Sequence, residues 1–235
     1  MTLGYRRFIV PAISTVAMLA VLIALGTWQV HRLHWKEAIL ARIATAEASP
    51  PIELPPGPVV AVPPPFTKIA VAGRFRFDRE ARFGDDVRDM PGGAAMGYGQ
   101  IVPLERDGAP DMLVLRGWVP EKRVVALDEP AGRQIVTGYV RPAEGPHWFS
   151  PADDVADRRF YTLDPAAIGR ALGLSNLEPF ILVAVGPSEP GLFPDPARQL
   201  PRPPNNHLSY VVTWYGLAVV LLVIFGTWVR KTVRS

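Results

Sequence analysis

Two apolar runs near the ends of the chain limit its fold more than any other feature. Residues 8–30 and residues 208–229 contain no charged side chain. Each run matches the roughly 20 apolar residues that an α-helix needs to cross a hydrocarbon core about 30 Å thick. A core helix of a soluble protein rarely reaches this length without a polar face. We therefore predict a membrane protein with two transmembrane helices, at residues 8–30 and 208–229.

A cleaved signal peptide is the alternative for the first run, because Arg6 and Arg7 precede it. Its apolar stretch is longer than the core of a typical signal peptide, and no small-x-small cleavage site follows it. The run ends instead with Trp28 and Gln29, and Trp28 is placed like an anchor at the membrane interface. These features favour a retained helix.

The charges are divided unevenly between the tails and the centre of the chain. All 22 acidic residues lie between the two runs, together with 20 of the 25 basic residues; the other five basic residues lie in the short tails. Basic residues in short segments favour the cytoplasmic side of a membrane. We therefore expect cytoplasmic tails at residues 1–7 and 230–235, and residues 31–207 on the periplasmic or equivalent outer side of a bacterial inner membrane.

Composition and motifs exclude several classes of function. The chain has no cysteine, which rules out disulfides and thiolate metal sites, and its five methionines are scattered, which argues against a copper chaperone. No basic patch is interleaved with aromatic residues, so we expect no nucleic-acid partner. No nucleophile elbow, zinc-protease motif, phosphate-binding loop or dinucleotide fingerprint is present. A membrane-anchored hydrolase or sensor is a further alternative, but the sequence offers no nucleophile, base and orienting residue for it. We therefore expect that the chain is not an enzyme.

The central segment has the pattern of a small domain between two connectors. The sequence after residue 30 continues without Gly or Pro, which predicts that the first helix projects from the membrane as an amphipathic stalk. Proline-rich stretches at residues 50–65 and 187–204 predict stiff connectors. Residues 84–99 are rich in glycine and are expected to be mobile, with no role that the sequence assigns.

Period-two alternation predicts the strands of this domain. Ile69, Val71, Phe75 and Phe77 alternate with basic residues, as in a half-buried strand. Further strands are predicted at residues 100–104 and 112–119, which form a hairpin, and at 134–141 and 180–185. A helix is predicted from Pro165 to residue 172, because Asp164 is a good N-cap, Pro165 suits the first position and Gly173 ends it. The fold class is therefore two transmembrane helices flanking a mainly antiparallel α+β domain, with a barrel as one possible form.

The four histidines differ in their positions. His31 and His34 lie three residues apart just after the first span, and His207 follows two asparagines at the start of the second. These three side chains are predicted at the same membrane surface, where they are able to approach one another. Histidine is also amphipathic and is stable at a membrane interface without any ligand. The sequence alone favours that interpretation for each of the three histidines. His147 is expected to be an exposed side chain in a loop.

A haem is the specific ligand that such a surface would suit. Neutral imidazole ligates haem iron, and the N-terminal end of the second helix carries a partial positive charge. Arg32 or Lys36 would pair with the anionic propionates. Trp28, Trp35, Tyr210 and Trp214 would supply an aromatic wall, although such residues are more often plain interface anchors.

Three motifs carry a resemblance to a known family. The first is Leu25-Gly26-Thr27-Trp28-Gln29 with Arg32 and Trp35-Lys36; the second is Arg116-Gly117-Trp118-Val119-Pro120; the third runs from Asn205-Asn206-His207 through Thr213-Trp214-Tyr215-Gly216-Leu217-Ala218. In this order around two spans, they resemble the surfeit-locus family of cytochrome c oxidase assembly factors. From the residues alone, the central motif has a structural interpretation too, in which Gly117 permits a bulge or a tight approach.

The resemblance implies a factor for the maturation of haem–copper oxidases. It implies haem A as a transient cofactor, with His207 as the haem-binding histidine and metal ligand. Arg32, Trp28 and Trp214 complete the candidate cofactor-binding set. The implied partners are the catalytic subunit of cytochrome c oxidase and the lipid bilayer, and haem A synthase is left open as a third.

Two hypotheses follow. In the first, the chain holds haem A at the outer end of the helix pair and hands it to the catalytic subunit. In the second, it is a membrane scaffold that stabilises an assembly intermediate without binding a cofactor. The sequence leaves open which oxidase is served, how stably haem is bound, what supplies a second haem ligand, and the oligomeric state.

Overall fold

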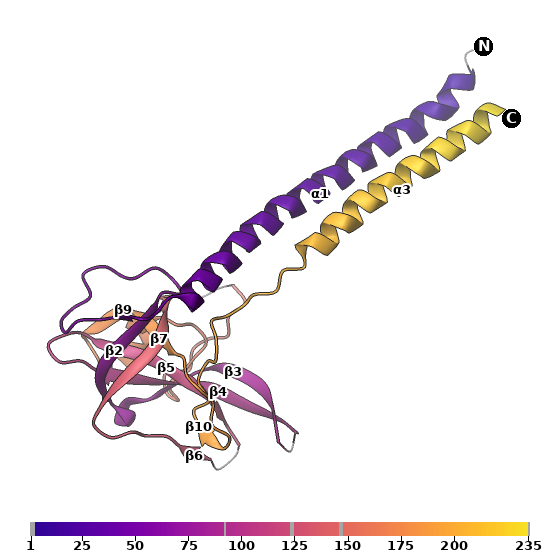
Figure 1. Ribbon diagram of the computed structural model, residues 1–235. Helices are drawn as coiled ribbons and strands as arrows, with labels where there is room; N and C mark the ends of the chain where they lie inside the picture. The colour runs from indigo at the N-terminus through magenta and orange to yellow at the C-terminus, as the bar shows by residue number, and fades with distance from the viewer. Residues whose placement is uncertain (1–2, 92, 123–124, 146–147, 235) are drawn as a thin grey trace. The chain divides into compact units, whose positions relative to one another are not determined.

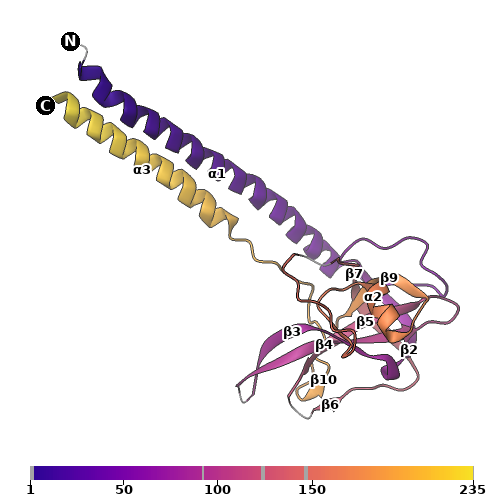
Figure 2. The ribbon, with the colours of Figure 1, turned by 180° about the vertical axis from the view of Figure 1, so that it is seen from behind.

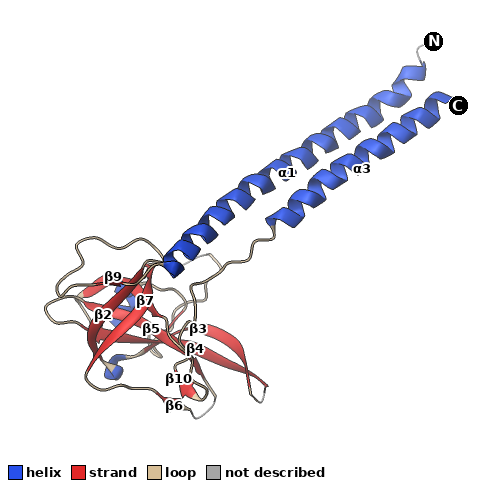
Figure 3. Cartoon of the chain, in the orientation of Figure 1, coloured by secondary structure: helices blue, strands red, loops and turns tan. Residues whose placement is uncertain are grey.

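The chain folds into two compact units. The computed structural model describes residues 3–91, 93–122, 125–145 and 148–234. One unit comprises residues 1–42 with 202–235, and the other comprises residues 43–201. The first holds helix α3 (His207–Arg234) and most of helix α1 (Leu3–Ala48), whereas the second holds the strands and the short helix α2 (Pro165–Leu172), as Figure 3 shows.

The helical unit contains both apolar runs. Helices α1 and α3 are long and apolar enough to cross a membrane. They run side by side in opposite directions, so that the start of α1 and the end of α3 lie at the same end of the pair (Figures 1 and 2). The prediction of two apolar helices flanking a β-rich domain is confirmed. Helix α1 also continues without a break to Ala48, as predicted for the stalk.

The second unit is built on a closed barrel of five strands. These strands are β2 (Lys68–Phe75), β4 (Gly93–Glu105), β5 (Asp111–Pro120), β7 (Arg133–Pro142) and β9 (Leu177–Ala184). Their order is β2-β7-β9-β5-β4, and β2 also pairs with β4, which closes the barrel. The β5–β9 pair is parallel and the other four pairs are antiparallel. The predicted mainly antiparallel α+β domain is therefore correct, and its form is a barrel.

Further strands extend the barrel sheet. They are β1 (Ile52–Glu53), which pairs with β2, β3 (Ala81–Met90), which pairs with β4, and β8 (Arg159–Phe160), which pairs with β3. Strands β6 (Ala126–Leu127) and β10 (Leu192–Phe193) form a separate small sheet. The short 3-10 helix η1 (Phe77–Arg79) follows β2. The alternation had predicted that this strand includes Phe77, but the strand ends at Phe75.

Two large groups of buried side chains fill the barrel unit, and a smaller one gathers around Trp118. One large group comes from all five strands of the barrel, and the other lies between α2 and strands β4, β5 and β9. Strand β2 shows how the sequence directs this packing, because its alternate residues Ile69 and Val71 are buried and those between them are less so. The period-two pattern therefore indicated the barrel interior correctly.

Helix α2 has the limits that its end signals predicted. A carboxylate oxygen of Asp164 accepts a hydrogen bond from the backbone N–H of Ala166 at 2.9 Å. Gly173 ends the helix with φ +68°, in the left-handed region that glycine adopts without strain. The buried residues Ile168 and Leu172 hold the helix against the second core group.

Replacing Asp164 with alanine is expected to lower the free energy of unfolding by about 1 kcal/mol, because the N-cap hydrogen bond is lost. Urea unfolding of the detergent-solubilised chain measures the change. Asp164→Asn, which keeps an acceptor oxygen, should stay within a few tenths of a kcal/mol of the parent chain. Equal losses in the two variants would contradict a capping role.

The described part of the glycine-rich stretch, residues 84–91 and 93–99, lies almost entirely in paired strands, so the prediction of a mobile stretch is wrong there. Strands β3 and β4 pair across this segment from Asp86 with Gly97 to Met90 with Gly93. A side chain at Gly97 would place its Cβ 2.3 Å from the carbonyl oxygen of Val119 and 2.4 Å from the ring of Trp118. Glycine is therefore required here by close packing of β4 on β5, and its presence does not indicate a loop.

A buried ion pair fixes the first proline-rich connector to the barrel. Arg106 Nη1 donates to Glu178 Oε1 at 2.7 Å, and the two side chains are 4% and 3% exposed. Arg106 Nη2 also donates to the carbonyl oxygen of Gly57 at 3.1 Å, and the backbone N–H of Val59 donates to Glu178 Oε1 at 3.3 Å. The pair thus satisfies backbone groups of a segment whose prolines cannot form a regular strand.

Candidate functional site

The two long helices pack along a regular seam. On α3 the less exposed residues recur at alternating steps of three and four, and on α1 they recur similarly near the end of the apolar run. These residues are Leu22, Gly26, Gln29 and Leu33 on α1, and Val211, Trp214, Ala218, Leu221, Phe225 and Trp228 on α3. This spacing is that of helices that cross at a small angle with interlocking side chains.

Gly26 allows a tyrosine of the facing helix to approach α1. A Cβ at Gly26 would lie 3.0 Å from Cζ of Tyr215. Beside it, the hydroxyls of Thr27 and Tyr215 are 3.2 Å apart and share a hydrogen bond. Small residues commonly permit such close contact between membrane helices. The Gly-Thr pair therefore aligns the two helices near the end of the seam where His207 lies.

His207 is the first residue of α3 and is paired with α1. Its ring Nδ1 lies 2.8 Å from Oε1 of Gln29, and the side chain of Gln29 is buried, with 8% of the residue exposed. The side-chain oxygen of Asn205 accepts from the backbone N–H of His207 at 3.4 Å. A histidine held through Nδ1 keeps Nε2 as the atom that can bind a metal. The residues therefore fit the ligand role expected for His207.

Trp214 offers a second feature that suits a ligand with acceptor oxygens. Its indole Nε1–H is buried and has no hydrogen-bond partner among the residues that the structure describes. Trp214 lies seven residues after His207, which places the two on one face of α3. A buried donor without a partner is costly, and a carbonyl or carboxylate of a bound molecule would satisfy it.

Arg32 and Trp28 are less closely connected with His207. Arg32 is exposed and lies one helical turn after Gln29, with its guanidinium 3.9 Å from the centre of the Trp35 ring. It is therefore oriented by stacking and open to an anionic group. Trp28 is 56% exposed and lies outside the seam, so it does not share a face of α1 with Gln29.

The structure does not bring the histidines together as a metal cluster. His31 and His34 are exposed on α1. No group of three His, Asp or Glu side chains able to hold a metal occurs within the described part of the chain. The prediction that His31 and His34 approach His207 is therefore wrong. At this end of α1, Gln29 and Leu33 are the residues that face α3. The prediction for His147 lies outside the described residues.

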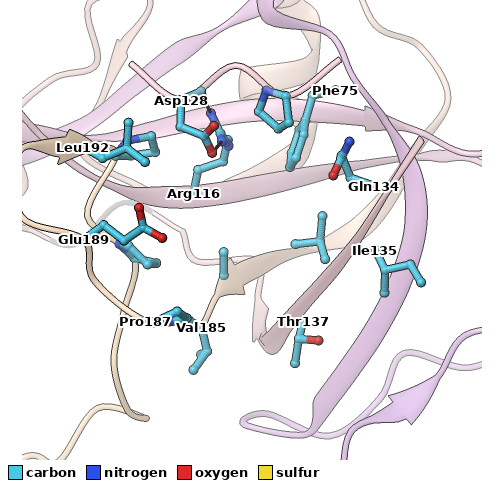
Figure 4. A pocket seen from close by; sticks show the side chains of 16 residues that line it. Phe75, Arg116, Asp128, Gln134, Ile135, Thr137, Val185, Pro187, Glu189 and Leu192 are labelled. Atoms are coloured by element: carbon cyan, nitrogen blue, oxygen red, sulfur yellow. Dashed lines mark hydrogen bonds and ion pairs between the residues drawn. The ribbon is translucent and has the colours of Figure 1, made fainter. Parts of the chain in front are cut away.

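A separate pocket of about 280 Å3 lies on the barrel unit (Figure 4). Its polar lining includes Arg116 and Asp128, together with Gln134, Thr137 and Glu189, and its apolar walls include Phe75, Ile135 and several prolines. Arg116 Nη1 donates to the backbone oxygen of Asp128 at 2.6 Å, and Nη2 to its carboxylate at 3.2 Å. Burial lowers the pKa of the Arg116 guanidinium, although the carboxylate of Asp128 opposes this shift. The positive charge of Arg116 is therefore already balanced by the carboxylate of Asp128.

The Arg-Gly-Trp motif is explained by a β-bulge. Opposite Gln100 and Ile101, the register on β5 skips Arg116, so that this residue has no partner in the ladder. Gly117 then allows residue 195 to cross over the strand, and Trp118 and Asp195 exchange two backbone hydrogen bonds of 2.9 Å. This supports the structural interpretation of the motif over direct contact with a ligand.

Gln29 is the site residue to which the sequence assigned no role. One signal was present, since Gln29 is a strongly polar side chain at the end of an otherwise apolar run. Its partner could not be found from this signal, because the pairing depends on the register of a helix that begins 178 residues later.

Comparisons with known proteins give one family. The SURF1 family model matches residues 16–219. The SURF1-like protein of Rickettsia felis is 29% identical, over 91% of this chain and 94% of that protein. The SURF1-like protein of Rickettsia prowazekii is 30% identical, over 87% and 84%. Surfeit locus protein 1 of Xenopus tropicalis is 27% identical, over 90% and 72%.

Proposed function

Because this chain belongs to the SURF1 family, we propose that it is an assembly factor that holds haem A at His207 and passes it to the catalytic subunit of cytochrome c oxidase. Membership of the family supports a role in the assembly of this oxidase and in a membrane setting. The finer steps, which are the binding of haem A, its transfer and the partner that receives it, are the proposal.

The pairing of His207 with Gln29 is the observation that carries the proposal. Haem A supplies an iron that a neutral imidazole can ligate. His207 presents Nδ1 to Gln29 and leaves Nε2 to bind the iron. It stands at the N-terminus of α3, where the helix dipole favours the negative charge of propionates. Arg32 offers a full positive charge one turn from Gln29.

The proposed orientation follows the division of charge in the sequence. The short basic tails would lie in the cytoplasm and residues 31–207 on the outer side of the inner membrane. The start of α1 and the end of α3 lie at one end of the helix pair (Figure 1), which is compatible with both tails being on one side of the membrane. The barrel unit would then face the same compartment as His207 and would contact the catalytic subunit.

Cells that lack their own protein of this family test the proposal. The parent chain, His207→Ala and His34→Ala would be expressed at equal levels, and haem A per catalytic subunit would be measured in purified oxidase. We expect the parent chain and His34→Ala to restore haem A content, and His207→Ala to lose most of this effect. Full restoration by His207→Ala would contradict haem handling and would favour a scaffold without a cofactor.

A further inference from the structure

Gln29 is a buried amide inside a largely apolar helix pair. It occupies the seam position after Leu22 and Gly26 on α1, where the neighbouring side chains are apolar or absent. An amide in such surroundings is costly unless it is hydrogen-bonded. Its oxygen meets that need through Nδ1 of His207, at 2.8 Å.

The chemistry of the two groups determines where the histidine proton lies. A side-chain carbonyl oxygen accepts hydrogen bonds and cannot donate them. The proton of this hydrogen bond is therefore carried by Nδ1 of His207. A neutral imidazole has a single N–H, so Nε2 keeps its lone pair, and metals bind the neutral ring through that lone pair.

We propose that Gln29 is a positioning residue that fixes His207 as the Nδ1-protonated tautomer and orients Nε2 as the metal-binding atom. The inference rests on the proposed function of His207 as a haem ligand, and it adds the residue on the other helix that prepares this ligand. It also makes the site depend on the pairing of α1 with α3, because neither helix alone holds both groups.

Removal of the acceptor should weaken haem A binding by about 10–100-fold, the usual effect of losing a group that orients a histidine ligand. Gln29→Met is the variant of choice, because methionine has a similar length and only a weak acceptor. Gln29→Glu keeps an acceptor oxygen in place and is expected to restore binding to within a few-fold. Leu22→Met, at another buried seam position, is the control for altered packing.

The first readout uses the chain without haem. Nitrogen NMR of detergent-solubilised chain, labelled at histidine with the heavy isotope, distinguishes a protonated ring nitrogen from an unprotonated one. The His207 signal is assigned from its loss in His207→Ala. We expect the Nδ1–H tautomer in the parent chain, Gln29→Glu and Leu22→Met, and a mixture of tautomers in Gln29→Met. A parent chain with Nε2–H, or a Gln29→Met chain that keeps Nδ1–H alone, would overturn the inference.

The second readout is an optical titration of the same proteins with haem A. A loss of affinity in Gln29→Met that Leu22→Met does not share supports the inference. Equal affinity in the parent chain, Gln29→Met, Gln29→Glu and Leu22→Met overturns the role of Gln29 in binding. A parent chain that shows the Nδ1–H tautomer and binds no haem A would instead overturn the proposed function. The positioning of His207 by Gln29 would still stand in that case.

Discussion

Replacing Glu178 with alanine is expected to lower the free energy of unfolding of the barrel unit by about 3–5 kcal/mol. The substitution leaves the guanidinium of Arg106 buried without its counter-charge, and it removes the acceptor for the backbone N–H of Val59. Such a loss is a large fraction of the total stability of a typical domain, which is about 5–15 kcal/mol. Urea unfolding of the detergent-solubilised chain, followed by tryptophan fluorescence, measures it.

An exposed ion pair of the same unit provides the control. Asp107 pairs with Arg133, and the two side chains are 79% and 55% exposed. Solvent screens such a pair, so Asp107→Ala should cost less than about 1 kcal/mol. If Glu178→Ala costs no more than Asp107→Ala, the account of Arg106 and Glu178 as the link between connector and barrel is wrong.

The second large effect is expected at Gly117. A Cβ at this residue would lie 2.3 Å from the carbonyl oxygen of Asp195 and 2.8 Å from the backbone nitrogen of Pro196, and its φ is +152°. Gly117→Ala should therefore push residues 195–196 off β5 and break the two hydrogen bonds between Trp118 and Asp195. We expect a loss of about 3 kcal/mol, from steric overlap together with the broken bonds.

Hydrogen exchange shows where this loss occurs. The amides of Trp118 and Asp195 should lose protection in Gly117→Ala, whereas those in the centre of β7 should exchange as in the parent chain. Gly145→Ala is the matched control, because a Cβ there meets no atom within 4 Å and its φ is not positive. Parent-like stability of Gly117→Ala would contradict the close approach.

Elements with local signals were predictable from the sequence. The two apolar helices follow from uninterrupted runs, and α2 follows from Asp164, Pro165 and Gly173, each of which acts within one turn of the helix end. Most barrel strands follow from alternating side chains. Closure of the barrel was left open, because it depends on β2 meeting β4, where Arg74 pairs with Glu105, and no local pattern encodes that contact.

The remaining features depend on contacts between distant residues. Arg106 and Glu178 are 72 residues apart, and each looks like an ordinary surface charge in the sequence. Gly97 suggested a loop, because glycine destabilises the interior of a strand. Here its missing side chain leaves the space that the ring of Trp118 occupies. At the candidate site, His207 was predicted from the family resemblance, but Gln29 needed the packing of the two helices. Polar partners across a helix pair are thus the part of the site that required the structure.

The haem A content of the purified chain tests the central claim most directly. Parent chain and His207→Ala would be purified from cells that make haem A, and their optical spectra would be compared at equal protein concentration. The account predicts haem A in the parent chain and its loss in His207→Ala, with the circular dichroism of both unchanged. Absence of haem A from both, while the chain still co-purifies with oxidase subunits, would contradict the account and leave a scaffold that binds no cofactor.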